Sequence, residues 1–179
     1  MKILLLNGSP RQGNTVEMLA ALKRGLANIP DLQLNEIAAD QVAVAPCKAC
    51  NACNMNAPCV HKDDTNMVID AILDADVVVF ATPVYWWDIT AQLKLIIDKM
   101  YSQQNKLEAQ DKKIGILLVG ECELDDPQYT IIPKQFDCIC DYLGWEIAFT
   151  GMYSALDPGD VLKVEGAMEE IEGFWKTLV

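Results

Sequence analysis

The stretch "LLLNGSPRQGNT" (residues 4–15) joins an apolar run to a helical pattern through a glycine-rich turn. The apolar run is typical of a buried parallel strand. The helical pattern places four apolar residues on one face: Met18, Leu19, Leu22 and Leu26. A strand, a glycine loop and a helix in this order gather free backbone N–H groups at the positive end of a helix dipole, which favours an anion. The stretch therefore predicts an α/β fold with an anion-binding loop after its first strand.

The rest of the chain repeats this alternation. Further strands are expected at 32–37, 76–82, 113–120 and 145–151, with the first at 2–7 and the 32–37 strand at an edge. Helices are expected at about 64–74, 90–100 and 128–143, and a last one after "DPGD" carries an apolar face of Val164, Met168, Ile171, Trp175 and Leu178. Residues 102–111 read as a polar connector. The pattern predicts a flavodoxin-like three-layer αβα sandwich with a five-stranded parallel sheet in the order 2-1-3-4-5, formed as a single domain over 1–179 with a cysteine-rich loop insertion at about 39–62.

Charge and hydropathy narrow the classes of partner. The chain has 179 residues and a formal net charge of -12, from 14 basic and 26 acidic residues. Nucleic acids and anionic membranes need a basic surface, so neither is expected as a partner. No apolar run approaches the ~20 residues that span a bilayer, and the first residues do not read as an export signal. We expect a soluble cytoplasmic protein that acts on small molecules or on other proteins.

The glycine loop differs from an ATP-binding loop at one position. Read as G-x-x-x-x-G-N-T, it has Asn14 where that motif needs lysine, so nucleoside triphosphate hydrolysis is a poor interpretation. It also contains no cysteine nucleophile of the kind a phosphatase uses. One terminal monophosphate is the better match, with Arg11 as a planar cationic donor and Asn14 as both helix cap, together with Glu17, and phosphate donor. The alternative is a turn that only connects strand and helix.

Three aromatic residues in a row follow the strand at 76–82. In "TPVYWWD" (82–88), Pro83 ends the strand, and the backbone N–H groups beyond it suit the polar edge of a flat heteroaromatic ring. The carboxyl ends of the first and third strands meet at the ligand crevice of this topology. A planar ring that carries one phosphate is the shape of FMN. The alternative is that Trp86 and Trp87 pack into the core or into a subunit interface.

The two stretches "GSPRQGNT" (8–15) and "PVYWWDITAQLKLIIDK" (83–99) resemble the NAD(P)H-dependent FMN reductase family of flavodoxin-like proteins, and the resemblance extends to "DPGDVLKVEGAMEEIEGFWKTL" (157–178). It implies FMN as cofactor, NAD(P)H as co-substrate, and a homodimer or homotetramer. It also implies that the flavin phosphate is bound by Ser9, Arg11, Gln12, Gly13, Asn14 and Thr15. The ring is then lined by Thr82, Pro83, Val84, Tyr85, Trp86 and Trp87. The pair Trp87-Asp88 departs from the pattern, because relatives often have small residues there.

Four of the seven cysteines lie close together in "CKACNACNMNAPC" (47–59). The spacing C-x2-C-x2-C-x5-C suits the ligands of an iron-sulfur cube and resembles the iron-sulfur flavoproteins of the same family, in which Cys47, Cys50, Cys53 and Cys59 would hold a 4Fe-4S cluster. The alternative is that these thiols line the flavin pocket or form a disulfide. His61 is either a further metal ligand or an exposed loop residue. The three remaining cysteines are expected to be buried: Cys122, Cys138 and Cys140.

The sequence contains no convincing Ser/His/Asp or paired-carboxylate arrangement and only one histidine. No catalytic protein residue is therefore expected, because FMN would carry the chemistry. The leading hypothesis is an enzyme that passes electrons from a reduced nicotinamide through FMN to a quinone, a flavin, a nitroaromatic or a metal complex. A second hypothesis is an iron-sulfur flavoprotein that carries electrons from a ferredoxin-like donor, and a third is an FMN-binding module without turnover.

Overall fold

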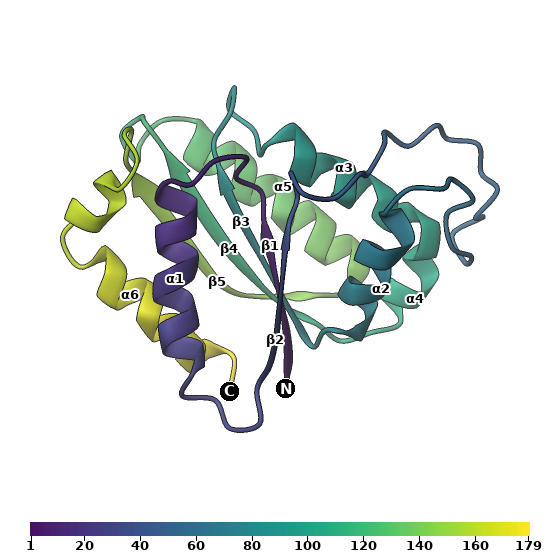
Figure 1. The fold of residues 1–179 in the computed structure, drawn as a ribbon, viewed down its shortest axis with the longest axis horizontal. Helices are drawn as coiled ribbons and strands as arrows, with labels where there is room; N and C mark the ends of the chain where they lie inside the picture. The colour runs from purple at the N-terminus through teal and green to yellow at the C-terminus, as the bar shows by residue number, and fades with distance from the viewer.

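A computed structural model describes residues 1–179 and contains one parallel sheet (Figure 1). Its strands are β1 (Lys2–Asn7), β2 (Gln33–Ala38), β3 (Val77–Pro83), β4 (Lys113–Gly120) and β5 (Glu146–Ser154). They lie in the order β2-β1-β3-β4-β5, and every pairing is parallel. The predicted flavodoxin-like topology is confirmed, including the edge position of β2.

Helices cover both faces of the sheet and make three layers (Figure 1). One face carries α1 (Asn14–Leu26) and α6 (Ala167–Gly173), and the other carries α2 (Thr65–Asp74), α3 (Ala91–Lys99) and α5 (Gln128–Leu143). Successive side chains of a strand point to opposite faces. Leu5 of β1 accordingly packs in the apolar cluster under α1, whereas Leu4 and Leu6 pack in the cluster under α2, α3 and α5. Every residue of β3 is buried, as expected for a central strand covered on both faces.

Gly115 of β4 lies directly beside the aromatic ring of Phe149, its partner residue on β5. A Cβ atom at this position would lie 2.2 Å from the ring of Phe149, which in turn stacks on Phe174 at 4.5 Å between ring centroids. The register of β4 against β5 shifts between Ile114 and Gly115. Only glycine leaves room for the Phe149 ring here, so this residue couples the strand pairing to the packing of the C-terminal segment.

Two expectations about the helices were wrong. The predicted single C-terminal helix is broken into a 3-10 turn at Asp160–Lys163, α6, and a second 3-10 turn at Phe174–Thr177, because Gly166 takes a left-handed backbone conformation (φ 74°) directly before α6. The connector at 102–111 contains a short helix, α4 (Gln104–Glu108), which follows a 3-10 turn at Met100–Gln103. The expected loop between β2 and α2 contains neither helix nor strand. No helix in the structure combines the length and the hydropathy that crossing a bilayer requires.

Candidate functional site

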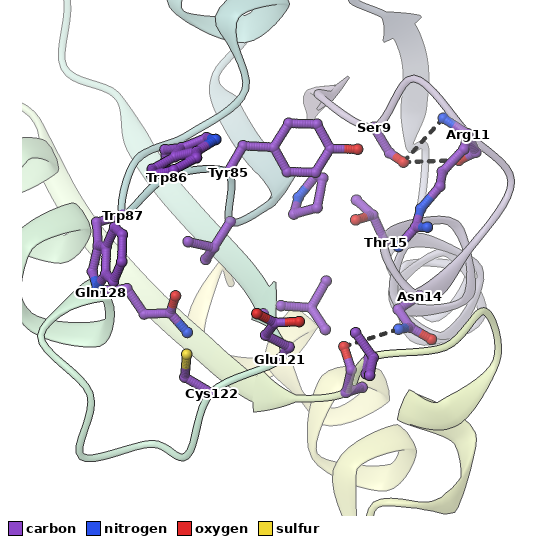
Figure 2. Close-up of a pocket in the computed structure, with 16 residues that line it drawn as sticks. Ser9, Arg11, Asn14, Thr15, Tyr85, Trp86, Trp87, Glu121, Cys122 and Gln128 are labelled. Carbon is purple, nitrogen blue, oxygen red and sulfur yellow. Dashed lines mark hydrogen bonds between the residues drawn. The ribbon is translucent and has the colours of Figure 1, made fainter.

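A cavity of about 480 Å³ opens at the carboxyl ends of the strands (Figure 2). The loop after β1 forms one end of it, and the loop after β3 forms the other. The ends of β4 and β5 and the first residue of α5 complete the wall. Its sixteen lining residues are Ser9, Arg11, Asn14, Thr15, Pro83, Val84, Tyr85, Trp86, Trp87, Val119, Gly120, Glu121, Cys122, Gln128, Ala155 and Leu156. The two loops that the sequence singled out therefore face one cavity, at the switch point of the sheet.

The loop after β1 is held in shape by its own hydrogen bonds. The backbone N–H of Ser9 donates to Oδ1 of Asn7 at 3.0 Å, and the Ser9 hydroxyl donates to the carbonyl oxygen of Arg11 at 2.8 Å. The N–H of Gly8 donates to Ala81 O of β3 at 2.7 Å, which ties this loop to the strand of the other loop. The Arg11 side chain remains exposed at the cavity. The loop is therefore organised before any anion arrives, which lowers the entropy cost of binding.

Asn14 does not cap α1, contrary to the sequence-based expectation. The helix is preceded by Gly13, and no side chain caps it. Asn14 instead donates from Nδ2 to Ala155 O at 3.2 Å and accepts from the N–H of Val161 at 3.3 Å. These bonds join the start of α1 to the chain that leaves β5. A primary amide has two N–H donors, so one remains for a ligand in the cavity.

The aromatic loop is a tight hairpin in a strained conformation. Tyr85 and Asp88 exchange two backbone hydrogen bonds of 2.9 and 3.1 Å, and Trp86 and Trp87 between them have φ angles of 52° and 60°. A left-handed conformation costs roughly 1–2 kcal/mol for each residue other than glycine. The Trp86 side chain is 90% exposed and that of Trp87 is 47% exposed. Neither tryptophan packs into the core, and backbone strain of this kind is typical of functional sites.

Buried and peripheral contacts hold this hairpin in place. Thr82 is fully buried, its hydroxyl donates to Pro83 O at 2.8 Å, and it accepts from the N–H of Thr90 at 3.2 Å. On the outer side, the indole Nε1 of Trp87 donates to Oδ1 of Asp126 at 3.1 Å. Thr82 therefore fixes the buried base of the hairpin, and Asp126 holds the hairpin to the loop after β4.

Three residues expected at the cofactor do not line the cavity: Gln12, Gly13 and Thr82. Conversely, the sequence reasoning missed the ends of β4 and β5 and the start of α5, which contribute Glu121, Cys122, Gln128, Ala155 and Leu156. The available signal was topological, because β4 is adjacent to β3 and its carboxyl end must open at the same edge. Arg11 and Glu121 are the only charged side chains in the lining, so the cavity has one cationic end.

The scattered cysteines are not all buried, as had been expected. Cys140 is buried, but Cys138 is exposed, and Cys122 is half-buried and lines the cavity. Burial, together with the charges of Asp126 and Glu121, raises the pKa of the Cys122 thiol. This cysteine therefore presents a neutral thiol to the cavity at neutral pH.

The cavity fits FMN in three respects. Its volume lies within the range of about 300–1,000 Å³ that is usual for ligand sites. A cationic, N–H-rich loop at a helix N-terminus forms one end, and an apolar wall with three aromatic side chains forms the other (Figure 2). In addition, the Nε2 atom of Gln128, whose side chain lies in the wall, is buried without a hydrogen-bond partner in the chain. An unpaired buried donor is consistent with a ligand that supplies the acceptor.

The clustered cysteines lie at a second, separate cavity of about 30 Å³. Cys47, Cys50, Cys53 and Cys59 all line it, and it shares no lining residue with the first cavity. All four are free thiols, and no three His, Cys, Asp or Glu side chains are gathered as in a metal site. This segment has four residues other than glycine with positive φ: Ala49, Asn51, Asn54 and Met55.

Polar and charged groups surround these thiols. Nε2 of His61 lies 3.9 Å from Sγ of Cys50. The buried Lys99 ammonium donates to Sγ of Cys59 at 3.7 Å and lies 3.5 Å from a carboxylate oxygen of Asp63. The donor set is that of a 4Fe-4S site, with the Lys99 cation beside one thiol.

The fold and the first cavity define a flavodoxin-like protein with a site for a mononucleotide that has a flat ring. Comparison with known proteins narrows this class: residues 1–124 match the family model described as NADPH-dependent FMN reductase. The chain belongs to this family.

Individual relatives agree with this assignment. The chain is 33% identical over 118 residues to an iron-sulfur flavoprotein of Methanosarcina thermophila, a match that spans 66% of this chain and 62% of that protein, less than two thirds of its length. It is 26% identical over 178 residues to the putative NAD(P)H-dependent FMN-containing oxidoreductase YwqN of Bacillus subtilis, covering 94% of this chain and 93% of that one. Among solved structures, an FMN-dependent NADH-azoreductase from Bacillus anthracis, in complex with FMN, has the same fold with a TM-score of 0.70 at 14% identity, covering 99% of both chains.

Proposed function

We propose that this protein is an FMN-dependent oxidoreductase that takes electrons from NADH or NADPH and passes them to a small-molecule acceptor. The observation that carries the proposal is that one cavity joins an anion-binding loop to an aromatic hairpin at the switch point of the sheet. Bound FMN would accept a hydride from the nicotinamide and return electrons to the acceptor. Membership of the family supports this activity.

The residues of the cavity would bind FMN and orient it. None of them is placed to act as a general base on the substrate. The free backbone N–H groups of the first turn of α1, the Arg11 guanidinium and the Thr15 hydroxyl suit the phosphate. Pro83 and Val84 supply an apolar surface for the ring, because the carboxyl end of β3 and the residue after it lie in the cavity wall. The only histidine, His61, lines the other cavity, which is consistent with chemistry carried by the cofactor.

The acceptor belongs to the class of planar aromatic or metal-centred oxidants: quinones, free flavins, nitroaromatics or metal complexes. Exposed aromatic side chains at the cavity mouth support a flat acceptor, since they offer a stacking surface. The same exposed side chains suit an interface, and we propose a homodimer or homotetramer in solution. Light scattering on the purified protein gives the mass directly, and a monomeric mass would refute the assembly.

The activity is tested on protein loaded with FMN in the absence of oxygen. NADH or NADPH is expected to bleach the flavin absorbance, and addition of a quinone is expected to restore it. The variant Arg11→Ala should need more FMN to reach the same occupancy. The variant Lys94→Ala, which changes a partly buried lysine of α3 outside this cavity, should not. A protein that stays colourless after incubation with FMN, or a flavin that neither nucleotide bleaches, would contradict the proposal.

A second candidate function is an iron-sulfur flavoprotein that carries electrons from a ferredoxin-like donor. The specific observation in its favour is that all four clustered cysteines line one small cavity beside the Lys99 ammonium. A bound 4Fe-4S cluster would supply one-electron transfer. The acidic chain, with a net charge of -12, would suit a donor with a basic docking face.

Iron and labile sulfide distinguish the two candidates. Protein purified without oxygen is expected to contain both if the second candidate holds, and Cys50→Ala should lose them while retaining FMN. Cys138→Ala is the matched control, because Cys138 is an exposed thiol away from both cavities. Absence of iron and sulfide from anaerobically prepared protein would refute the carrier function and leave the nicotinamide-dependent activity unaffected.

A further inference from the structure

Gln128 is a buried amide that the fold alone does not explain. It is the first residue of α5, its side chain is only 4% exposed, and it lies in the wall of the flavin cavity. Its backbone N–H is satisfied, because it donates to Oδ1 of Asp126 at 3.0 Å. The side-chain Nε2, by contrast, is buried and makes no hydrogen bond of good geometry within the chain.

The surroundings of this amide supply at most one acceptor, the hydroxyl of Tyr129. A Cβ atom on Gly120 would lie 2.7 Å from Nε2, so the amide rests over the bare backbone of that glycine. The nearby Tyr129 hydroxyl donates to Tyr153 O at 2.8 Å and accepts from the N–H of Gly120 at 3.1 Å. A hydroxyl oxygen has two lone pairs and the N–H of Gly120 takes one, so the other can accept at most one N–H of Gln128. The amide has two N–H donors, so at least one of them remains unpaired.

An unpaired amide inside a wall is unfavourable, and an apolar side chain of similar size would avoid the cost. The position of the amide indicates what satisfies it. Arg11 and Ser9 lie at one end of the cavity, and Gln128 lies at the opposite end beside Trp87 and Cys122 (Figure 2). A ligand anchored by its phosphate at the first end therefore extends its ring system towards Gln128.

The flavin ring has two chemically different edges. The dimethylbenzene edge has no acceptor, whereas the pyrimidine edge carries two carbonyl oxygens and suits a buried N–H donor. We propose that Gln128 Nε2 donates a hydrogen bond to a pyrimidine carbonyl of bound FMN and so selects which edge of the ring faces α5; this rests on the proposed function. The terminal torsion of glutamine is broad, so the amide can turn its nitrogen from the wall to the ligand.

The first test measures affinity without turnover. Apoprotein is titrated with FMN, and quenching of flavin fluorescence gives the dissociation constant for wild type, Gln128→Met and Gln135→Met. Gln135 is the matched control, since it lies on the same α5 helix, also has an unpaired buried atom (Oε1), and does not line the flavin cavity. Gln128→Met should bind FMN about tenfold more weakly, and Gln135→Met should bind it as wild type does. Equal affinity for wild type and Gln128→Met would overturn the inference.

Apoprotein stability supplies an independent readout. Gln128→Met removes an unpaired polar group, so its apoprotein should melt at the wild-type temperature or above it. A lower melting temperature together with unchanged FMN affinity would give Gln128 a structural role and overturn the inference.

The second test changes the ligand and begins with the wild-type protein. In 2-thio-FMN and 4-thio-FMN one carbonyl oxygen is replaced by sulfur, a weaker acceptor. Wild type should lose affinity for one of the two analogues, which identifies the carbonyl, and Gln128→Met should show no such loss. Equal losses in both proteins would assign the donor to another group, and no loss in wild type would exclude the bond. Failure of wild type to bind FMN at all would instead overturn the proposed function, and this inference with it.

Discussion

The hydrogen bond between Trp87 and Asp126 is expected to hold the aromatic hairpin in its binding conformation. Two left-handed residues, Trp86 and Trp87, together cost roughly 2–4 kcal/mol of backbone strain. The two backbone bonds between Tyr85 and Asp88 offset part of it, and the bond from Trp87 Nε1 to Asp126 Oδ1 supplies the link to the neighbouring loop. Replacement of Asp126 by alanine removes that link.

The magnitude follows from the two bonds that Oδ1 of Asp126 accepts. The indole bond is to a charged acceptor but lies at the surface, where Trp87 is 47% exposed, so it is worth about 1 kcal/mol. The bond from the N–H of Gln128, the first residue of α5, is worth about 1 kcal/mol as well. Asp126→Ala should therefore lower the free energy of unfolding by about 2 kcal/mol.

FMN affinity reports on the hairpin separately from global stability. If closing the hairpin becomes about 1 kcal/mol less favourable, the dissociation constant for FMN rises about fivefold. Asp126→Asn keeps an acceptor oxygen and should recover most of the loss. Both quantities are measurable by denaturant unfolding and by flavin fluorescence titration.

A double-mutant cycle isolates the bond itself. Trp87→Phe removes the indole donor and keeps an aromatic ring, so Asp126→Ala should have a smaller effect on FMN affinity in that background, with a coupling free energy of about 1 kcal/mol. Strictly additive effects of the two substitutions on FMN affinity would mean that the contact does not hold the hairpin.

Three further predictions concern other parts of the molecule. Arg11→Ala should weaken FMN binding about 10- to 100-fold, the value of a charge-assisted bond, yet leave binding of riboflavin, which has no phosphate, unchanged; equal losses for both ligands in parallel titrations would contradict a phosphate role. Gly115→Ala should destabilise the fold by about 2 kcal/mol or more, because its Cβ would lie 2.2 Å from the Phe149 ring. If this variant unfolded at the same urea concentration as wild type, the packing of Phe149 against Gly115 would be contradicted. Burial, with Asp137 and Asp141 nearby, raises the pKa of Cys140 to about 12, so at pH 8 this thiol stays protonated and iodoacetamide should modify the exposed Cys138 first, a difference that should shrink only near pH 12; mass spectrometry of the peptides checks the order.

The topology of this protein could be predicted from its sequence because it depends on local patterns. The apolar run at β3 is buried on both faces, and the weaker alternation at β2 marks an edge strand, so strand order follows from connection rules. The C-terminal helix was mispredicted for a local reason too: apolar periodicity continued through Gly166, whose left-handed conformation breaks the chain direction.

The candidate site was only half predictable. The glycine loop and the "TPVYWWD" loop are recognisable in the sequence from their unusual residues. Glu121 and Cys122, after the end of β4, line the cavity only because of where the fold places them. The role of Asn14 also escaped, because its partners Ala155 and Val161 lie more than a hundred residues away in the sequence. Contacts between segments so far apart in the chain produce no recognisable pattern in the sequence.

By itself, the sequence determined the parallel sheet, the glycine loop between β1 and α1, and the cysteine spacing, since each rests on residues that are neighbours along the chain. Only the tertiary structure decided that Trp86 and Trp87 are exposed on a strained hairpin, that Asp126 holds this hairpin, and that Gln128 lies unpaired in the cavity wall. The physical reason is that burial and hydrogen-bond pairing are properties of the packed chain. Whether a polar side chain has a hydrogen-bond partner depends on the positions of all the groups packed around it in the folded chain.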